Sequence, residues 1–140
     1  MRSMWCHDGE MEPVNRVVMP DGIAAPAANY AHAVHTVGAS AWLHTSGVVP
    51  IAPDGVVPDD IEAQAEVVWA NIVAMLADAA MTPADIVSVT TYAVVGENLA
   101  PVMAVRDRVL NGHLVASTLV TVPALARPEW RMEIAIVAAR

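Results

Sequence analysis

Apolar residues recur at helical spacing in two segments of the chain. In residues 61–79 they come at every third or fourth position, which predicts a helix with one apolar face. Asp59 and Asp60 precede this pattern and provide an N-cap and negative charge at the positive end of the helix dipole, and Thr82-Pro83 ends it. The same spacing predicts a second, shorter helix over residues 97–111, which ends at Asn111-Gly112.

Runs rich in β-branched and apolar residues predict six strands. They cover residues 14–19, 30–37, 41–47, 85–95, 117–122 and 131–138. Gly38-Ala39-Ser40 joins the second run to the third, so we predict a hairpin there. Several prolines and Asp54-Gly55 indicate a loop over residues 49–57.

The order of these elements predicts an α+β fold. Three strands, a helix, a strand, a second helix and two strands are typical of one mixed sheet with two helices packed on one face. The strands also carry Val, Ile and Ala on the face that the helices would leave uncovered. This second apolar face is therefore expected to need a partner.

Composition supports a single domain that associates with itself. The chain has 140 residues, of which 56% are hydrophobic and 16% are charged, and this excludes a disordered protein. We expect one domain over residues 13–140, preceded by a flexible extension over residues 1–12. The few polar residues cannot cover the surface of a monomer of this size. Part of the apolar surface is therefore expected to be buried in an oligomer.

Charge and cysteine content exclude several classes of function. The net charge is −8 and the chain has no lysine, so nucleic acid is not expected as a partner, and neither a Schiff-base nor a P-loop lysine is present. The apolar runs are too short to span a membrane, and the first residues have no signal-peptide pattern. Cys6 is the single cysteine, which fits a cytoplasmic protein. Cys6-His7-Asp8 resembles half a metal site, but no second cluster completes it.

Several motifs, in order and spacing, resemble those of the Rid/YjgF family, whose members are called reactive-intermediate deaminases, enamine/imine deaminases or L-PSP endoribonucleases. The similarity extends over residues 14–140. The quoted segments are Tyr30-Ala31-His32-Ala33-Val34, Leu43-His44-Thr45-Ser46-Gly47, Asp60-Ile61-Glu62-Ala63-Gln64-Ala65, Ala116-Ser117-Thr118 and Met132-Glu133-Ile134.

The resemblance implies a fold and an assembly. The fold is a chorismate-mutase-like (bacillus type) α+β sandwich that assembles into a homotrimeric barrel with the sheets facing inward. Clefts between neighbouring subunits bind a small metabolite such as a keto acid. In the deaminases of the family an arginine binds the substrate carboxylate, a glutamate and a water hydrolyse the imine to a ketone and ammonia, and no metal or organic cofactor is needed.

The family's site residues fall on definite positions of this chain. The resemblance assigns the site tyrosine to Tyr30, the serine to Ser46 and the catalytic glutamate to Glu133. The arginine belongs to a segment that here reads Ala116-Ser117-Thr118, and its own position is Ala116. A site asparagine falls near Met103.

An alanine at the arginine position changes the expected ligand. An arginine–carboxylate contact is charged and bidentate, and its loss would cost about 2–4 kcal/mol in a desolvated cleft. We therefore do not assign the standard 2-iminoacid deaminase activity from the sequence. Ala116 and Met103 instead indicate a more apolar pocket for an uncharged ligand.

Each candidate has a plainer structural alternative. Glu133 is either a general acid/base or an ordinary strand carboxylate. His44 and Ser46 lie two residues apart and face the same way, as a water-orienting pair or as a structural polar pair. Tyr30 either donates to a ligand or packs at an interface.

Two arginines near the last strand are candidates to replace the missing one. Arg131 alternates with Glu133 and would share its face, and Arg127 flanks the same loop. The alternative for Arg131 is surface charge or a salt bridge to Glu129.

Two functions remain open for the chain as a whole. They are hydrolysis or tautomerisation of an enamine, imine or related carbonyl compound, and non-catalytic binding of a small metabolite by the trimer.

Overall fold

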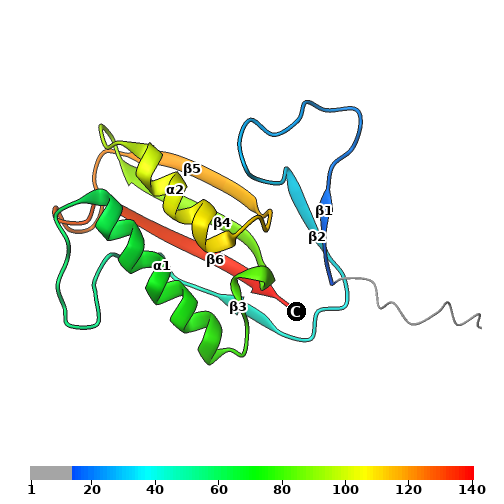
Figure 1. The fold of residues 1–140 in the computed structure, drawn as a ribbon, viewed down its shortest axis with the longest axis horizontal. Helices are drawn as coiled ribbons and strands as arrows, with labels where there is room; N and C mark the ends of the chain where they lie inside the picture. The colour runs from blue at the N-terminus through cyan, green and yellow to red at the C-terminus, as the bar shows by residue number, and fades with distance from the viewer. Residues whose placement is uncertain (1–13) are drawn as a thin grey trace, which may run out of the picture.

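The computed structural model describes residues 14–140 and contains two long helices and six strands (Figure 1). The expectations for residues 1–12, with Cys6, His7 and Asp8, lie outside the described residues. In chain order the elements are β1 (Asn15–Val18), β2 (Ala33–Thr36), β3 (Trp42–His44), α1 (Ile61–Asp78), the short 3-10 helix η1 (Pro83–Asp85), β4 (Ile86–Val94), α2 (Leu99–Leu110), β5 (Ala116–Val122) and β6 (Met132–Ala139).

Four strands form a mixed sheet in the order β3-β6-β4-β5. β4 and β5 run parallel, whereas β6 is antiparallel to both of its neighbours, β3 and β4. The helices α1 and α2 lie side by side across one face of this sheet (Figure 1). The predicted α+β arrangement of two helices on a mixed sheet is confirmed.

The predicted hairpin between the second and third strands is wrong. β2 pairs with β1, so that Arg16 lies opposite His35, and β3 pairs with β6, so that Leu43 lies opposite Ala138. Ser40 N and Ala41 N both donate to Arg140 O, at 2.9 and 3.0 Å, and so draw the connecting segment onto the end of β6. The chain therefore crosses from one sheet to the other instead of turning back on itself.

The single predicted sheet is also wrong, because β1 and β2 form a separate two-stranded sheet. This pair extends to one side of the four-stranded sheet (Figure 1). Two contacts hold it there: Ala31 N donates to Val115 O at 2.8 Å, and Asn15 Nδ2 donates to Ala139 O at 2.8 Å. Since these contacts involve only the ends of the strands, β2 does not add a full ladder to β5.

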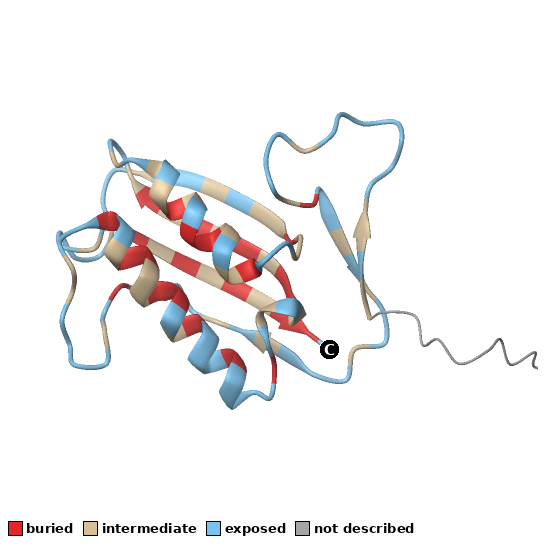
Figure 2. Ribbon diagram, viewed as in Figure 1, coloured by how far each residue is buried: buried red, intermediate tan, exposed pale blue. Residues whose placement is uncertain are grey.

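The core lies between the helices and the four-stranded sheet. Helix α1 begins where the Asp60 side chain accepts from Ala63 N at 3.0 Å, as the sequence predicts. Its buried face meets the buried positions of β4 and β6, and Figure 2 shows these alternating with half-buried positions along both strands. The largest members of this core include Trp69, Ile72, Leu76, Ile134 and Ile136. One face of the sheet is thereby filled, and no second layer among residues 14–140 covers the other.

Candidate functional site

The strand pleat places Glu133 on the sheet face that no helix covers. Met132, Ile134 and Ile136 are buried against the helices, so the residues between them point the other way. The strand partners of these residues extend the same face across the sheet. We call it the uncovered face; it comprises Trp42, His44, Ser88, Thr90, Tyr92, Ala116, Thr118, Val120, Glu133, Ala135 and Val137.

Glu133 packs directly on the backbone of Gly47. A methyl group at Gly47 would lie 2.5 Å from Glu133 Oε1, which is closer than real contacts allow. The approach arises from an extra residue in the segment that follows β3. His44 pairs with Val137 and Val48 pairs with Ile134, so an advance of four residues along this segment matches three residues along β6. Glu133 is half-buried, and its carboxylate forms no hydrogen bond or ion pair with another described residue.

His44 and Ser46 do not form the polar pair considered from the sequence. The His44 ring stacks on Trp42 instead, with ring centroids 6.2 Å apart and an interplanar angle of 20°. Thr45, between them, uses its Oγ1 to accept from Ile136 N at 3.0 Å on the other side of the strand. Ser46 is exposed and directly precedes the Gly47 that supports Glu133.

Tyr30 and Ala116 lie together at the opposite end of the uncovered face. The bridge between Ala31 and Ala116 brings the Tyr30 segment to the start of β5. The Tyr30 hydroxyl accepts from Ala27 N at 3.3 Å, and its ring meets the His32 ring edge-on with centroids 5.9 Å apart. Thr118 follows on the same face and is exposed.

One chain does not bring these two groups together. Tyr92 pairs with both Glu133 and Val120, and Ala116 lies four residues before Val120 on β5. At the usual rise of a strand, four residues correspond to about 13 Å, and two strand spacings add to that distance. Ser46 and Glu133 therefore lie in one cluster, and Tyr30, Ala116 and Thr118 in another.

Two further candidates belong to the helix side of the sheet. The Ser117 hydroxyl accepts from Arg106 Nη1 at 3.0 Å, so it is already used between β5 and α2. Met103 is a half-buried residue of α2 and therefore lies across the sheet from Glu133. Within one chain, neither residue shares the face of Glu133.

The two arginines near β6 have partners of their own. Arg131 Nη1 forms an ion pair with Glu97 Oε1 at 2.5 Å, and not with Glu129 as the alternative from the sequence had it. The Arg127 guanidinium lies over the Trp130 ring, 5.5 Å from its centroid. Both side chains are thus held at the surface loops that precede β6.

The sequence did not predict the structural role of Arg106. In the pattern of residues 97–111 it is simply one of the residues at helical spacing. Its side chain is 3% exposed. It pairs with Asp107 Oδ1 at 2.8 Å and donates to Asn29 O at 3.2 Å as well as to Ser117. It therefore ties the loop that carries Tyr30 to α2 and β5. The signal available in the sequence was a charged residue on the buried stripe of a helix.

Replacing Arg106 with methionine is expected to lower the free energy of unfolding by about 2–3 kcal/mol, because Asn29 O and Ser117 lose a charged donor. Urea denaturation followed by tryptophan fluorescence measures this change. Arg108→Met is the matched control: Arg108 lies on the same helix, but its pair with Glu66 is exposed, so less than about 1 kcal/mol is expected. Equal losses in the two variants would contradict the proposed role of Arg106.

Across residues 14–140, no group of three or more His, Cys, Asp or Glu side chains comes together as a possible metal site. In the same residues no helix is long and apolar enough to cross a lipid bilayer.

Comparison with known proteins places this geometry in a family. Residues 22–140 match the family model described as endoribonuclease L-PSP. A comparison with curated protein sequences gives no match. Among solved structures, the Rid-family protein of unknown function YyfB from Yersinia pestis is 29% identical, with a TM-score of 0.78 over 91% of this chain and 100% of that one.

Two further structures agree. A candidate endoribonuclease from Thermotoga maritima is 30% identical, with a TM-score of 0.67 over 89% of this chain and 97% of that one. The YjgF protein from Escherichia coli is 27% identical, with a TM-score of 0.66 over 89% of this chain and 98% of that one.

Proposed function

The chain belongs to the endoribonuclease L-PSP family, also called the Rid/YjgF family. On this basis we propose that it acts as a homotrimer whose inter-subunit clefts bind a small metabolite. In this proposal Glu133 is the acid/base of a water-dependent hydrolysis or tautomerisation of an enamine, imine or related carbonyl compound. The observation that carries it is the Glu133 carboxylate, half-buried on Gly47 and without a partner among the described residues.

The proposed chemistry needs one group that both takes and returns a proton. Glu133 accepts a proton from water as the water oxygen bonds to the imine carbon, and it returns this proton to the nitrogen, which gives a neutral carbinolamine. It then accepts the hydroxyl proton of the carbinolamine and delivers it to the nitrogen. The C–N bond breaks, ammonia leaves with the bonding pair, and the carbonyl compound remains. An enamine enters the same sequence after a proton moves to its carbon. Glu133 ends each cycle in the state in which it began.

Two observations support an assembly of several copies. The uncovered face carries apolar residues, among them the exposed Trp42 and Val120, that no layer in the described part of the chain covers. The Tyr30 cluster and the Glu133 cluster lie at different ends of that face, so a second copy is needed to set them opposite each other. A trimer with the sheets turned inward meets both requirements.

A non-catalytic metabolite-binding trimer is the second candidate function. The observation that favours it is Ala116, which stands where the resemblance assigns the arginine that binds the substrate carboxylate, while Arg127 and Arg131 are engaged elsewhere. We do not propose ribonuclease activity, because the net charge is −8 and the chain has no lysine to offer to a phosphate backbone.

Gly47→Ala is expected to abolish ammonia release while leaving the fold intact. The added methyl group would collide with Glu133 Oε1, and the flexible carboxylate can swing away at little cost in stability. The measurement is ammonia release from a panel of freshly generated neutral and carboxylate-bearing imines, together with the melting temperature of each variant.

Gly22→Ala is the matched control, because a methyl group there has no neighbour within 4 Å. The catalytic proposal requires that Gly22→Ala keeps the wild-type rate and Gly47→Ala loses it. A different result would favour the binding function over the catalytic proposal. In that case the wild-type protein releases no ammonia from any imine, but its melting temperature rises when a stable analogue of one of these imines is added.

A further inference from the structure

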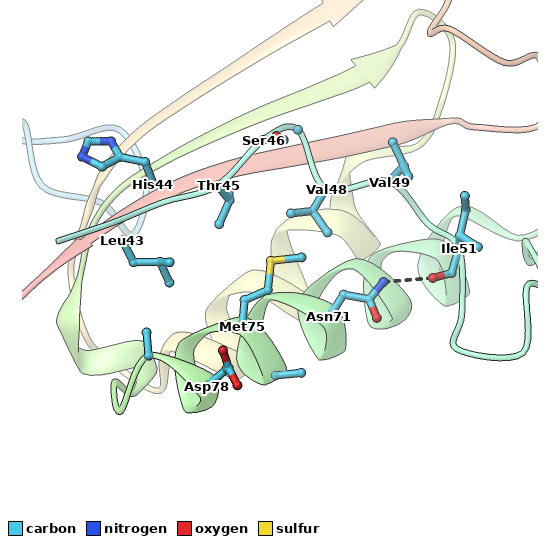
Figure 3. A pocket seen from close by; sticks show the side chains of 13 residues that line it. Leu43, His44, Thr45, Ser46, Val48, Val49, Ile51, Asn71, Met75 and Asp78 are labelled. Carbon is cyan, nitrogen blue, oxygen red and sulfur yellow. Dashed lines mark hydrogen bonds between the residues drawn. The ribbon is translucent and has the colours of Figure 1, made fainter.

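A cleft separate from the uncovered face opens between α1 and the segment that follows β3 (Figure 3). Its volume is about 810 Å³, within the range of small-molecule sites. It lies on the helix side of the segment over residues 43–48. Gly47 belongs to both sides of this segment, because it borders the cleft and also contacts the Glu133 carboxylate. The cleft lining includes Leu43, Thr45, Val48, Ala74, Met75 and Asp78.

The walls of the cleft are mainly apolar. Leu43 and Val48 project from one side, and Met75 rises from α1 on the other (Figure 3). The Met75 side chain is 40% exposed although it faces this concave surface, so a ligand could bury it further. His44 and Ser46, on the same segment, also border the cleft, but their side chains are directed away from Met75 (Figure 3). The cleft therefore suits a ligand with a hydrocarbon body.

One end of the cleft is negatively charged. Asp78, the last residue of α1, lines it and follows Met75 by three residues on the same helix (Figure 3). Asp78 forms no ion pair with any residue in the described part of the chain. The last turn of α1 contains no basic residue, so the negative end of the helix dipole adds to the charge of this carboxylate.

Arg140 brings positive charge to this helix end without pairing with Asp78. Its Nη1 donates to Ala80 O, beyond the end of α1. Positive charge is the favoured complement of a helix C-terminus, and the Asp78 carboxylate itself has no ion-pair partner among the described residues. A ligand cation at Asp78 would supply that charge, whereas a ligand carboxylate would be repelled.

We propose that this cleft is a second ligand site, for an apolar primary amine. The hydrocarbon body packs against Leu43, Val48 and Met75, and the ammonium group lies at Asp78. The Thr45 hydroxyl accepts from Ile136 N and retains its own hydrogen, so it offers the ligand only a secondary donor. This site does not depend on Glu133, on the trimer or on the proposed reaction.

The test compares three six-carbon ligands whose head groups are positive, neutral and negative. Hexylammonium, hexan-1-ol and hexanoate are titrated into the full-length protein near pH 7, and amide chemical shifts report the site and the affinity. Hexylammonium is expected to bind at least three-fold more tightly than hexan-1-ol, with shifts at Thr45, Met75 and Asp78, and hexanoate is expected not to bind there. Equal binding of the amine and the alcohol, or shifts confined to other residues, would overturn the proposal.

Variants of α1 separate specific binding from a general charge effect. Asp78→Asn and Glu62→Gln each remove one negative charge from the same helix, but Glu62 lies in its first turn, away from the cleft. Asp78→Asn is expected to weaken hexylammonium binding about three-fold or more, and Glu62→Gln to leave it unchanged. Ala74→Phe, which fills the cleft from an exposed position of the helix, is expected to prevent binding. Equal effects of the two charge variants, or full binding to Ala74→Phe, would contradict the proposed site.

Discussion

Glu133→Gln is expected to lower kcat/KM for imine hydrolysis by a factor of about 10²–10⁴, the usual contribution of a general acid/base. Glutamine keeps the shape of the side chain and its packing on Gly47, but its amide cannot take a proton from water and return it to the departing nitrogen. Ammonia release measured under kcat/KM conditions gives the effect. Size-exclusion chromatography of the same sample checks that the assembly is unchanged.

Glu129→Gln is the matched control for this substitution. Glu129 is an exposed acid four residues before Glu133, and the contact that the structure records for it uses only its backbone carbonyl, which accepts from Gln64 Nε2 at 2.8 Å. Its replacement changes the net charge equally and is expected to leave the rate at the wild-type value. A Glu133→Gln protein that hydrolyses imines at the wild-type rate would remove Glu133 from the mechanism.

Ala135→Arg is expected to convert the proposed trimer into monomers. Ala135 lies on β6 next to Thr90 of β4, within the uncovered face. In a trimer each copy of the new guanidinium would lose its water, at a cost of several kcal/mol per charge, and a contact with the Glu133 carboxylate two residues away would offset this cost only in part. In a monomer the same side chain remains in solvent. Sedimentation velocity at micromolar concentration distinguishes the two states.

Ala104→Arg carries the same change on the exposed side of α2 and is expected to keep the wild-type assembly. If Ala135→Arg still sediments as a trimer, the uncovered face is not the interface. If it becomes monomeric and still releases ammonia at the wild-type rate, the site does not need a second copy. The proposed inter-subunit cleft requires that dissociation and loss of activity occur together.

The helices could be predicted closely because their signals are local. Asp60 caps α1 as expected, and the helix begins at Ile61 and ends at Asp78, one residue before the end of the predicted segment. The second helix begins at Leu99 with Asn98 as its N-cap, two residues later than predicted, and ends at Asn111 in the left-handed conformation. Caps and apolar spacing act within a few residues, so the sequence contains them directly.

The candidate site could be predicted only in its components. The resemblance pointed to Tyr30, Ser46, Glu133 and Ala116, but their spatial arrangement depends on strand register. The extra residue between His44 and Val48 places Gly47 against Glu133, and no local sequence pattern predicts this extra residue. The contacts of Arg106 likewise join segments 77 and 11 residues apart in the chain.

The sequence by itself determined the element types, the order of strands and helices, the apolar excess and the family. Only the tertiary structure decided the partners of the strands: β2 joins β1, β3 joins β6, and Glu133 lies about 13 Å along the sheet from the level of Ala116. The physical reason is that propensity and capping act over neighbouring residues, whereas strand pairing is set by contacts between distant segments, such as Ser40 and Ala41 with Arg140. The apolar surface inferred from composition thereby acquires a definite place, the uncovered face of the four-stranded sheet.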